Sequence, residues 1–172
     1  MNVIIVTGER EGGKTRFLNE LFENFLKKGK TVGGFLSLGT LNNEGERDFE
    51  LKDLSSGIKI PLASRSPANS YLLLGRFFFN PPAIKFGNEI IINAINKNVD
   101  VIIMDEIGPV ELEGNAWFKA LNKVLSEYEG KLYISVRKRL VDAVIEKFSL
   151  RNVTVIDISQ SEGQSPEGFY NP

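Results

Sequence analysis

The chain contains neither cysteine nor histidine. Without cysteine it has no disulfide, no thiolate nucleophile and no cysteine-ligated metal site. Without histidine it lacks the commonest general base and the commonest ligand of transition metals. Any catalysis must therefore use carboxylates, lysine, arginine, hydroxyl groups, backbone amides or an oxygen-bound cation such as Mg2+.

Long apolar runs and a strong excess of one charge are also lacking. No stretch approaches the ~20 apolar residues that cross a bilayer, and the N-terminal segment 1–9 lacks the basic start and apolar core of a secretory signal. We therefore expect no membrane segment and a cytoplasmic location. A net charge of −1 gives no strong signal for nucleic-acid binding. The 172 residues suit one compact domain, 1–172.

Strands and helices alternate along most of the chain. The β-branched run 3–6 is typical of a strand buried on both faces, and apolar residues recur at helical spacing from Phe17 to Leu26. We therefore predict an α/β fold with a mostly parallel sheet and helices on both faces. The expected strands are 3–6, 31–38, 99–104, 132–136 and 153–158, and the expected helices are 17–26, 81–95, 115–128 and 139–148.

Three segments depart from this alternation. Residues 39–80 predict an inserted antiparallel region, in which 48–54 and 58–63 form a hairpin and short strands follow at 71–74 and 77–79. The pair Gly33-Gly34 indicates a bulge or a close backbone approach within the second strand. The C-terminal segment 159–172, rich in Ser, Gly, Gln and Pro, is expected to be a loose tail.

The segment Gly8 to Thr15 matches the phosphate-binding pattern G-x-x-x-x-G-K-[ST] at every fixed position. It follows a buried strand and opens an amphipathic helix, so that backbone N–H groups and the helix N-terminus can hold phosphate oxygens. Lys14 would bridge the β- and γ-phosphates of a nucleoside triphosphate, and the Thr15 hydroxyl would bind Mg2+. The expected nucleotide-binding residues are Gly8, Glu9, Arg10, Glu11, Gly12, Gly13, Lys14, Thr15 and Arg16.

A second motif is the apolar run 101–104, which ends in Asp105 and Glu106. In P-loop enzymes an aspartate at this place holds Mg2+ through water. Successive residues at the end of a strand point in different directions. Asp105 can therefore serve the metal while Glu106 orients or deprotonates the attacking water.

These motifs resemble a known family. The loop GEREGGKT, the segment GGFLS at 33–37 and above all DEIGPVEL at 105–112 are similar to the small P-loop nucleoside-triphosphatases of the THEP type. The resemblance implies hydrolysis of ATP, GTP, CTP and UTP to the diphosphate and phosphate, with Mg2+ and little base selectivity. It also implies phosphate and metal roles for Lys14 and Thr15, a metal-associated role for Asp105 and a catalytic role for Glu106.

The chain departs from this family pattern at two places. Arg16 stands where the family usually has a hydroxyl residue, and Ser135-Val136-Arg137 stands where members often carry a histidine. The second departure puts the family's phosphate-sensing role at this strand end in doubt. Arg137 lies just past the strand after the acidic pair, where related ATPases place a polar sensor of the γ-phosphate, so it is a candidate catalytic sensor. The start of a solvated helix is an equal alternative. Glu111 either braces the Asp105 loop or, as we favour, is a surface acid.

Other residues have less specific interpretations. Arg47 and Arg65 could reach substrate, although a solvated strand edge is favoured, and the Phe77–Phe79 run is expected to pack in the sheet rather than stack on a base.

Two rival functions remain. A small-molecule or nucleotide kinase would need an arginine-rich lid, and the arginines of 39–80 are too widely spread to indicate one. A nucleotide-dependent binding or assembly module with slow hydrolysis is the other rival.

Overall fold

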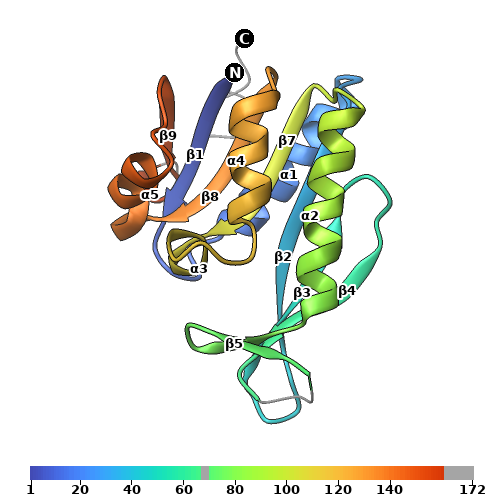
Figure 1. Ribbon diagram of the computed structural model, residues 1–172, viewed down its shortest axis with the longest axis vertical. Coiled ribbons are helices and arrows are strands. Elements are labelled where there is room, and N and C mark those ends of the chain that lie inside the picture. Colours follow the sequence, from blue (N-terminus) through green and yellow to red (C-terminus); the bar gives the residue numbers. More distant parts are fainter. Residues whose placement is uncertain (67–69, 161–172) are drawn as a thin grey trace.

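The computed structural model describes residues 1–66 and 70–160, whose strands form one mixed sheet (Figure 1). Its order is β5-β6-β4-β3-β2-β7-β8-β1-β9. The five strands from β2 to β9 in this order are parallel, and the other four extend the sheet in antiparallel fashion beyond β2. The strands are β1 (Asn2–Gly8), β2 (Val32–Leu41), β3 (Arg47–Asp53), β4 (Lys59–Ser64), β5 (Leu72–Leu74), β6 (Phe77–Phe79), β7 (Val101–Ile107), β8 (Lys131–Arg137) and β9 (Val153–Asp157).

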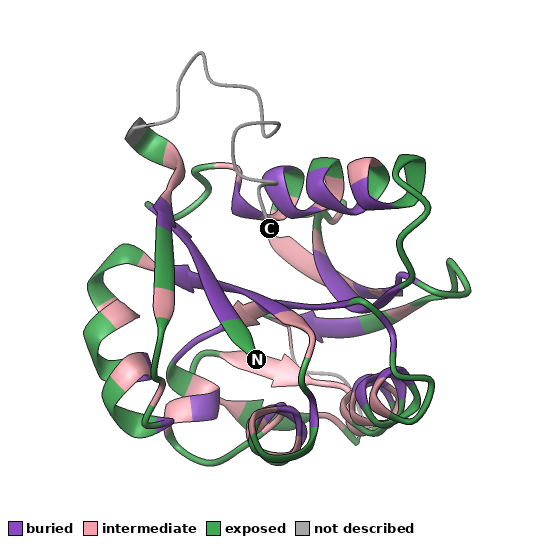
Figure 2. Cartoon of the chain, turned by 90° about the horizontal axis from the view of Figure 1, so that it is seen from above, coloured by how far each residue is buried: buried purple, intermediate pink, exposed green. Residues whose placement is uncertain are grey.

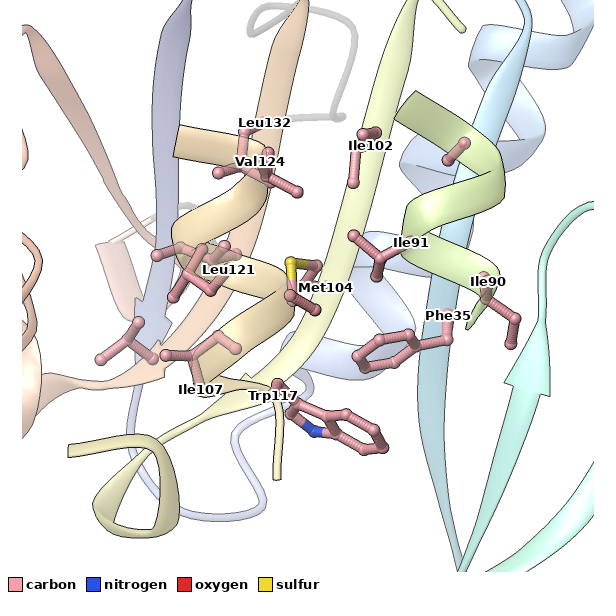
Figure 3. Packing of buried hydrophobic residues seen from close by; sticks show 14 of the residues in the cluster. Phe35, Ile90, Ile91, Ile102, Met104, Ile107, Trp117, Leu121, Val124 and Leu132 are labelled. Atoms are coloured by element: carbon pink, nitrogen blue, oxygen red, sulfur yellow. The ribbon is translucent and has the colours of Figure 1, made fainter. Parts of the chain in front are cut away.

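Helices cover both faces of this sheet, as the alternating pattern predicts (Figure 2). Helix α1 (Lys14–Lys27) packs on one face. Helices α2 (Pro81–Asn96), α4 (Phe118–Glu127) and α5 (Val141–Lys147) pack on the other. The larger apolar cluster lies on this second face, where Phe35 of β2 contacts Trp117 and Met104 of β7 is fully buried (Figure 3).

Some boundaries differ from those expected. The segment 115–128 begins its helix only at Phe118, and a separate short helix, α3 (Pro109–Leu112), precedes it. Pro109 suits a first helical turn because its missing N–H needs no partner there. The expected helix 139–148 opens with a 3₁₀ turn, Lys138–Leu140, and another 3₁₀ turn, Ile158–Gln160, follows β9. Most of the tail 159–172 lies outside the described residues.

The Gly33-Gly34 pair is a close backbone approach, one of the two predicted alternatives. Gly34 has a φ of +111°, and a Cβ atom there would lie 1.9 Å from the carbonyl oxygen of Ile103. A Cβ on Gly33 would lie 2.5 Å from that of Ala94 on α2. Only glycine allows β2 to pair this tightly with β7 while α2 packs against it. This contact holds β2 beside the strand that ends in the acidic pair.

The insertion has the predicted hairpin form. Strands β3 and β4 pair around the turn at 54–58, and β6 joins β4 and β5. Phe77 and Phe79 pack against the larger apolar cluster, as expected for this aromatic run. Within residues 1–66 and 70–160, none of the helices combines the length and the apolar character needed to span a bilayer.

Candidate active site

The phosphate loop connects β1 to α1. Its turn is closed by a 3.1 Å hydrogen bond from the Gly12 N–H to the Glu9 carbonyl, and Gly13 adopts a left-handed conformation with φ of 91°. Gly13 is the N-cap residue of α1, and among the described residues no side chain caps this helix start. The N–H groups of the first turn are therefore available to phosphate oxygens, and the helix dipole favours an anion there.

Lys14 is buried under this loop. The residue is 5% exposed, and its Nζ donates to the carbonyl oxygens of Gly8 at 3.3 Å and Glu9 at 2.8 Å. Burial lowers the pKa of Lys14, and the charges of Glu106 and Asp105 oppose this effect. The ammonium group therefore lies between the loop backbone and the acidic pair.

A bulge at the end of β7 separates the two acids. The register with β8 shifts between Met104 and Ile107, and Glu106 has a φ of 62°, an uncommon conformation for a residue other than glycine. The Glu106 N–H donates to Ser135 Oγ at 2.7 Å and to Asp105 Oδ1 at 3.0 Å. The bulge turns Asp105 into the protein, whereas Glu106 stays partly exposed at the site.

Asp105 is fully buried among hydrogen-bond donors. Oδ2 accepts the Ser37 N–H at 3.0 Å, and the hydroxyls of Ser135 and Thr15 also bond to the carboxylate. Burial and the charge of Glu106 raise the pKa of Asp105 to about 6, against the opposing effect of these hydrogen bonds. Neither serine was predicted to hold Asp105. Only the predicted adjacency of neighbouring strands could have suggested them.

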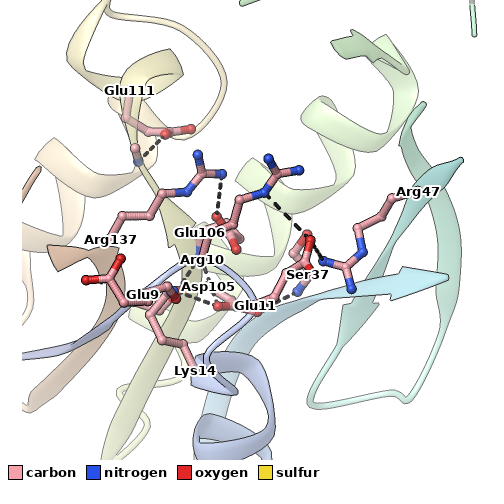
Figure 4. A network of polar contacts seen from close by, with 12 residues as sticks. Glu9, Arg10, Glu11, Lys14, Ser37, Arg47, Asp105, Glu106, Glu111 and Arg137 are labelled. Carbon is pink, nitrogen blue, oxygen red and sulfur yellow. Dashed lines mark hydrogen bonds and ion pairs between the residues drawn. The ribbon is translucent and has the colours of Figure 1, made fainter. Parts of the chain in front are cut away.

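Arg137 lies at the end of β8, the strand between β1 and β7. Its register partner on β1 is Gly8, the first residue of the phosphate loop. Its Nη2 lies 3.6 Å from Glu106 Oε2, and its side chain is only 23% exposed (Figure 4). The side chain therefore reaches the acidic pair, unlike that of a fully solvated helix start. Its sensor role stays a prediction.

One acid of the loop, Glu11, is paired with two arginines. Glu11 Oε1 lies 2.8 Å from Arg47 Nη1 of β3 and 3.7 Å from Arg10 Nε (Figure 4). The favoured expectation for Arg47, a solvated strand edge, is therefore wrong, because its side chain is only 36% exposed and pairs with Glu11 of the phosphate loop. Arg65 instead lies over the Phe77 ring at 5.7 Å, and Arg16, with 83% of its side chain exposed, lies 3.8 Å from Glu20.

A cavity of about 520 Å³ runs along the loop. Lys14, Thr15, Glu106 and Arg137 contribute to its lining, together with Arg47 of the extension. Side chains from β7, β8, α1 and the loop thus face one space. The sequence predicted these residues separately, and the fold brings them together.

Glu111 is not a surface acid. It is 2% exposed, and its Oε2 accepts the Gly108 N–H at 2.8 Å. The N–H of Trp117 also bonds to its carboxylate, while burial raises its pKa to about 7. The favoured interpretation was therefore wrong, because the short helix α3 turns this side chain inward. Glu111 braces the corner that follows Glu106.

The residues present suit a magnesium ion. In the described ranges 1–66 and 70–160, no three carboxylates cluster to form an all-protein metal cage. Magnesium in phosphoryl-transfer sites needs no such cage, because one or two protein oxygen groups and the substrate phosphates suffice. The hydrogen bond between Thr15 and Asp105 brings one hydroxyl and one carboxylate together beside the phosphate loop.

Comparison with known sequences gives consistent matches. A protein-family profile described as NTPase matches residues 3–165. The nucleoside-triphosphatase THEP1 of Archaeoglobus fulgidus is 28% identical over 158 residues, 91% of this chain and 90% of that protein. The THEP1 of Pyrococcus abyssi is 30% identical over 140 residues, 80% of this chain and 75% of that protein.

Solved structures agree on the fold. The crystal structure of THEP1 from the hyperthermophile Aquifex aeolicus has a TM-score of 0.75 at 20% identity, with 97% of this chain and 96% of that chain covered. The solution structure of a human cancer-related nucleoside triphosphatase has a TM-score of 0.66 at 23% identity, covering 91% and 88%. These likenesses confirm the predicted P-loop α/β fold. With a profile match over nearly its whole length, the chain belongs to the NTPase family that includes the THEP1 nucleoside-triphosphatases.

Proposed function

We propose that this chain hydrolyses nucleoside triphosphates to the diphosphate and phosphate, with Lys14, Asp105, Glu106 and Arg137 as its working residues. One observation carries the assignment. The loop after β1, the bulge at the end of β7 and the end of β8 bring the Lys14 ammonium, the Glu106 carboxylate and the Arg137 guanidinium to one cavity. The buried Asp105 carboxylate is hydrogen-bonded to Thr15 and to the Glu106 N–H, two residues of the cavity lining. These are the groups that phosphoryl transfer requires for positioning and charge neutralisation.

Each group has a distinct task. The loop amides and Lys14 hold the β- and γ-phosphates, and Arg137 contacts the γ-phosphate from the neighbouring strand. Glu106 orients a water molecule toward the γ-phosphorus and receives its proton. Its ion pair with Arg137 keeps the carboxylate at this end of the cavity. Positioning supplies most of the rate acceleration, because phosphoryl transfer asks for little covalent chemistry.

Thr15 and Asp105 would hold Mg2+, with Asp105 acting through water. Bound there, the ion would neutralise charge on the β- and γ-phosphate oxygens. Ser37 and Ser135 fix the Asp105 carboxylate by hydrogen bonds, and such partners orient a metal-associated ligand. We also propose low base selectivity, since the residues that converge here all address the phosphate end of a nucleotide.

The test is phosphate release from ATP, GTP, CTP and UTP, each with Mg2+ and with EDTA. We expect release from all four with Mg2+, at rates within about tenfold of one another because a missing base contact is worth only ~1 kcal/mol. No release from any of them would overturn the proposal. Strong acceleration by a cell extract would favour the binding-module rival, whose slow hydrolysis awaits a partner.

A further inference from the structure

A second cavity adjoins the phosphate cavity on the far side of Glu106. Its volume is about 130 Å³, and Glu106, Arg137, Ser37, Phe49 and Phe77 line both spaces. The second cavity continues between the β5–β6 hairpin and the α3 corner. A molecule bound in it would therefore contact the residue that we propose to activate water.

The walls of this cavity are mainly apolar and aromatic. Phe49 and Phe77 meet edge to face with ring centroids 5.3 Å apart, and Phe79 and Trp117 complete an aromatic lining. The volume is close to the ~150 Å³ of an engineered apolar cavity that binds benzene. A single six-membered ring is thus the size of ligand that this space accepts. Face and edge contacts with four aromatic side chains favour an aromatic ring.

The polar groups of the cavity lie together. Glu106 and Arg137 occupy its border with the phosphate cavity, while Arg76 comes from the turn between β5 and β6. The pKa of Arg76 is lowered by surrounding positive charge, first of all that of Arg10, with further effects of Arg137, Arg65 and Arg139. The fold thus brings a group of two arginines, Arg76 and Arg137, to one cavity although they are far apart in the sequence. Such a group suits a transferring phosphoryl group.

We propose that this cavity binds a small molecule with one aromatic ring and a hydroxyl group, and that the hydroxyl accepts the γ-phosphoryl group in place of water. The inference rests on the proposed function, because it uses the same Glu106 and the same triphosphate. A bond forms between the hydroxyl oxygen and the γ-phosphorus. The bond from the γ-phosphorus to the bridging oxygen breaks, and its electron pair stays on the diphosphate. The hydroxyl proton moves to Glu106.

Binding can be measured without any reaction. Trp117 is the only tryptophan of the chain and lines the cavity, so its fluorescence reports occupancy. We would titrate the nucleotide-free protein with benzyl alcohol and with toluene, which has the same ring but no hydroxyl. Both probes should shift Trp117 fluorescence in a saturable way. Absence of a saturable shift with both would overturn the site, whether or not the protein hydrolyses triphosphates.

Transfer is tested by product analysis with ATP and Mg2+. Benzyl alcohol should yield benzyl phosphate. The amount of free phosphate should fall, relative to the reaction without alcohol, by the amount of ester formed. Toluene should yield no ester. Saturable binding of benzyl alcohol without benzyl phosphate, under conditions in which the same protein releases phosphate from ATP, would overturn the acceptor assignment. Phosphate release without any probe reports the proposed function separately.

Two matched substitutions locate the effect. Val110→Phe adds a ring at the partly buried α3 wall of the cavity, and Val155→Phe makes the same change at an exposed position on β9. Val110→Phe should abolish the probe-induced shift in Trp117 fluorescence and the formation of benzyl phosphate. Each is measured against the same variant without probe. Val155→Phe should retain both. Equal responses of the two variants would place the probe elsewhere and overturn the proposal.

Discussion

At the scale of single residues, two adjacent carboxylates differ sharply in their surroundings. Asp105 is fully buried and accepts several hydrogen bonds, whereas Glu106 is partly exposed and lies near the Arg137 guanidinium. The bulge at the end of β7 produces this difference, because it lets consecutive side chains take separate directions. A buried, hydrogen-bonded carboxylate suits metal association, and a partly exposed one suits contact with water.

The two acids should therefore fail in different ways when changed. Glu106→Gln keeps the size but removes the charge that orients or deprotonates water. We expect near-normal triphosphate affinity and a turnover about 100-fold lower, the usual scale for losing a positioned base. Asp105→Asn should instead weaken the Mg2+ dependence of nucleotide binding. Calorimetry and phosphate release measure both effects, with the exposed Glu129→Gln as the control. Parent-like turnover of Glu106→Gln would contradict this division and direct attention to Glu111.

Arg137 gives a prediction about the γ-phosphate alone. Arg137→Ala should lower triphosphate affinity or turnover about tenfold or more, because a hydrogen bond to a charged group is worth ~1.5–3 kcal/mol. Affinity for the diphosphate should change little. Titration with ATP and ADP makes the comparison, and Arg151→Ala, at an exposed position, is the control. An equal loss of affinity for ATP and ADP, or no loss of affinity or turnover, would contradict the sensor role of Arg137.

At the scale of elements, the corner between β7 and α4 depends on one buried acid. Glu111 of α3 accepts backbone N–H groups from both sides of the corner, those of Gly108 and Trp117. Burial raises the pKa of Glu111 from 4.5 to about 7. The corner thereby connects the position of Glu106 to the packing of Trp117 in the apolar cluster.

This raised pKa predicts the pH dependence of folding. Between about 4.5 and 7 the folded protein keeps the Glu111 proton and the unfolded chain has lost it. The contribution of Glu111 to the free energy of unfolding is therefore greatest below pH 4.5, where the carboxyl is protonated in both states. It falls by up to ~3 kcal/mol as the pH rises from 4.5 through the folded-state pKa of about 7. Glu111→Gln is neutral throughout and should remove this fall.

Denaturant unfolding of parent and variant across this pH range measures the effect. Glu113→Gln, at the exposed end of the same short helix, controls for the loss of a nearby charge. A difference in unfolding free energy between the parent and Glu111→Gln that stays constant with pH would contradict the raised pKa.

At the scale of the whole molecule, the strand order builds the site. Strand β8 lies between β1 and β7, so the phosphate loop, Arg137 and the acidic pair meet at the carboxyl ends of three parallel strands. The antiparallel extension lies beyond β2, and from it Arg47 reaches Glu11 of the loop. The site thus joins the parallel half of the sheet to the inserted half.

A ligand that binds only the folded state stabilises the whole molecule. With Mg2+ and ATP at about 100 times Kd, the gain is about 2.7 kcal/mol, which corresponds to a rise of ~5–10 °C in Tm for a chain of this size. Lys14→Ala should abolish most of this rise, because it removes the cation of the phosphate loop. Thermal unfolding with and without nucleotide measures it, and Lys27→Ala, exposed at the other end of α1, is the control. A full rise in Lys14→Ala would contradict the assigned role of the loop.

The sequence by itself predicted the elements and the main motifs. Hydrophobic periodicity and the Gly-rich turn are local signals, so they identified the strand before Gly8, the helix after Lys14 and the apolar strand before Asp105. The inserted hairpins were predicted for the same reason. The sequence also indicated a bulge or a close backbone approach at Gly34, because glycine inside a strand commonly marks one of these two features.

The tertiary structure decided what those motifs meet. Ser37 and Ser135 hold Asp105, Arg47 pairs with Glu11, and Glu111 turns inward, yet nothing local distinguishes these residues from solvated ones. Strand order and the bulge at Glu106 arise from pairings between segments far apart in the chain. Burial, pKa and charge pairing depend on those distant neighbours. A residue's type therefore predicted its possible chemistry, and only the folded arrangement selected the partners that determine it.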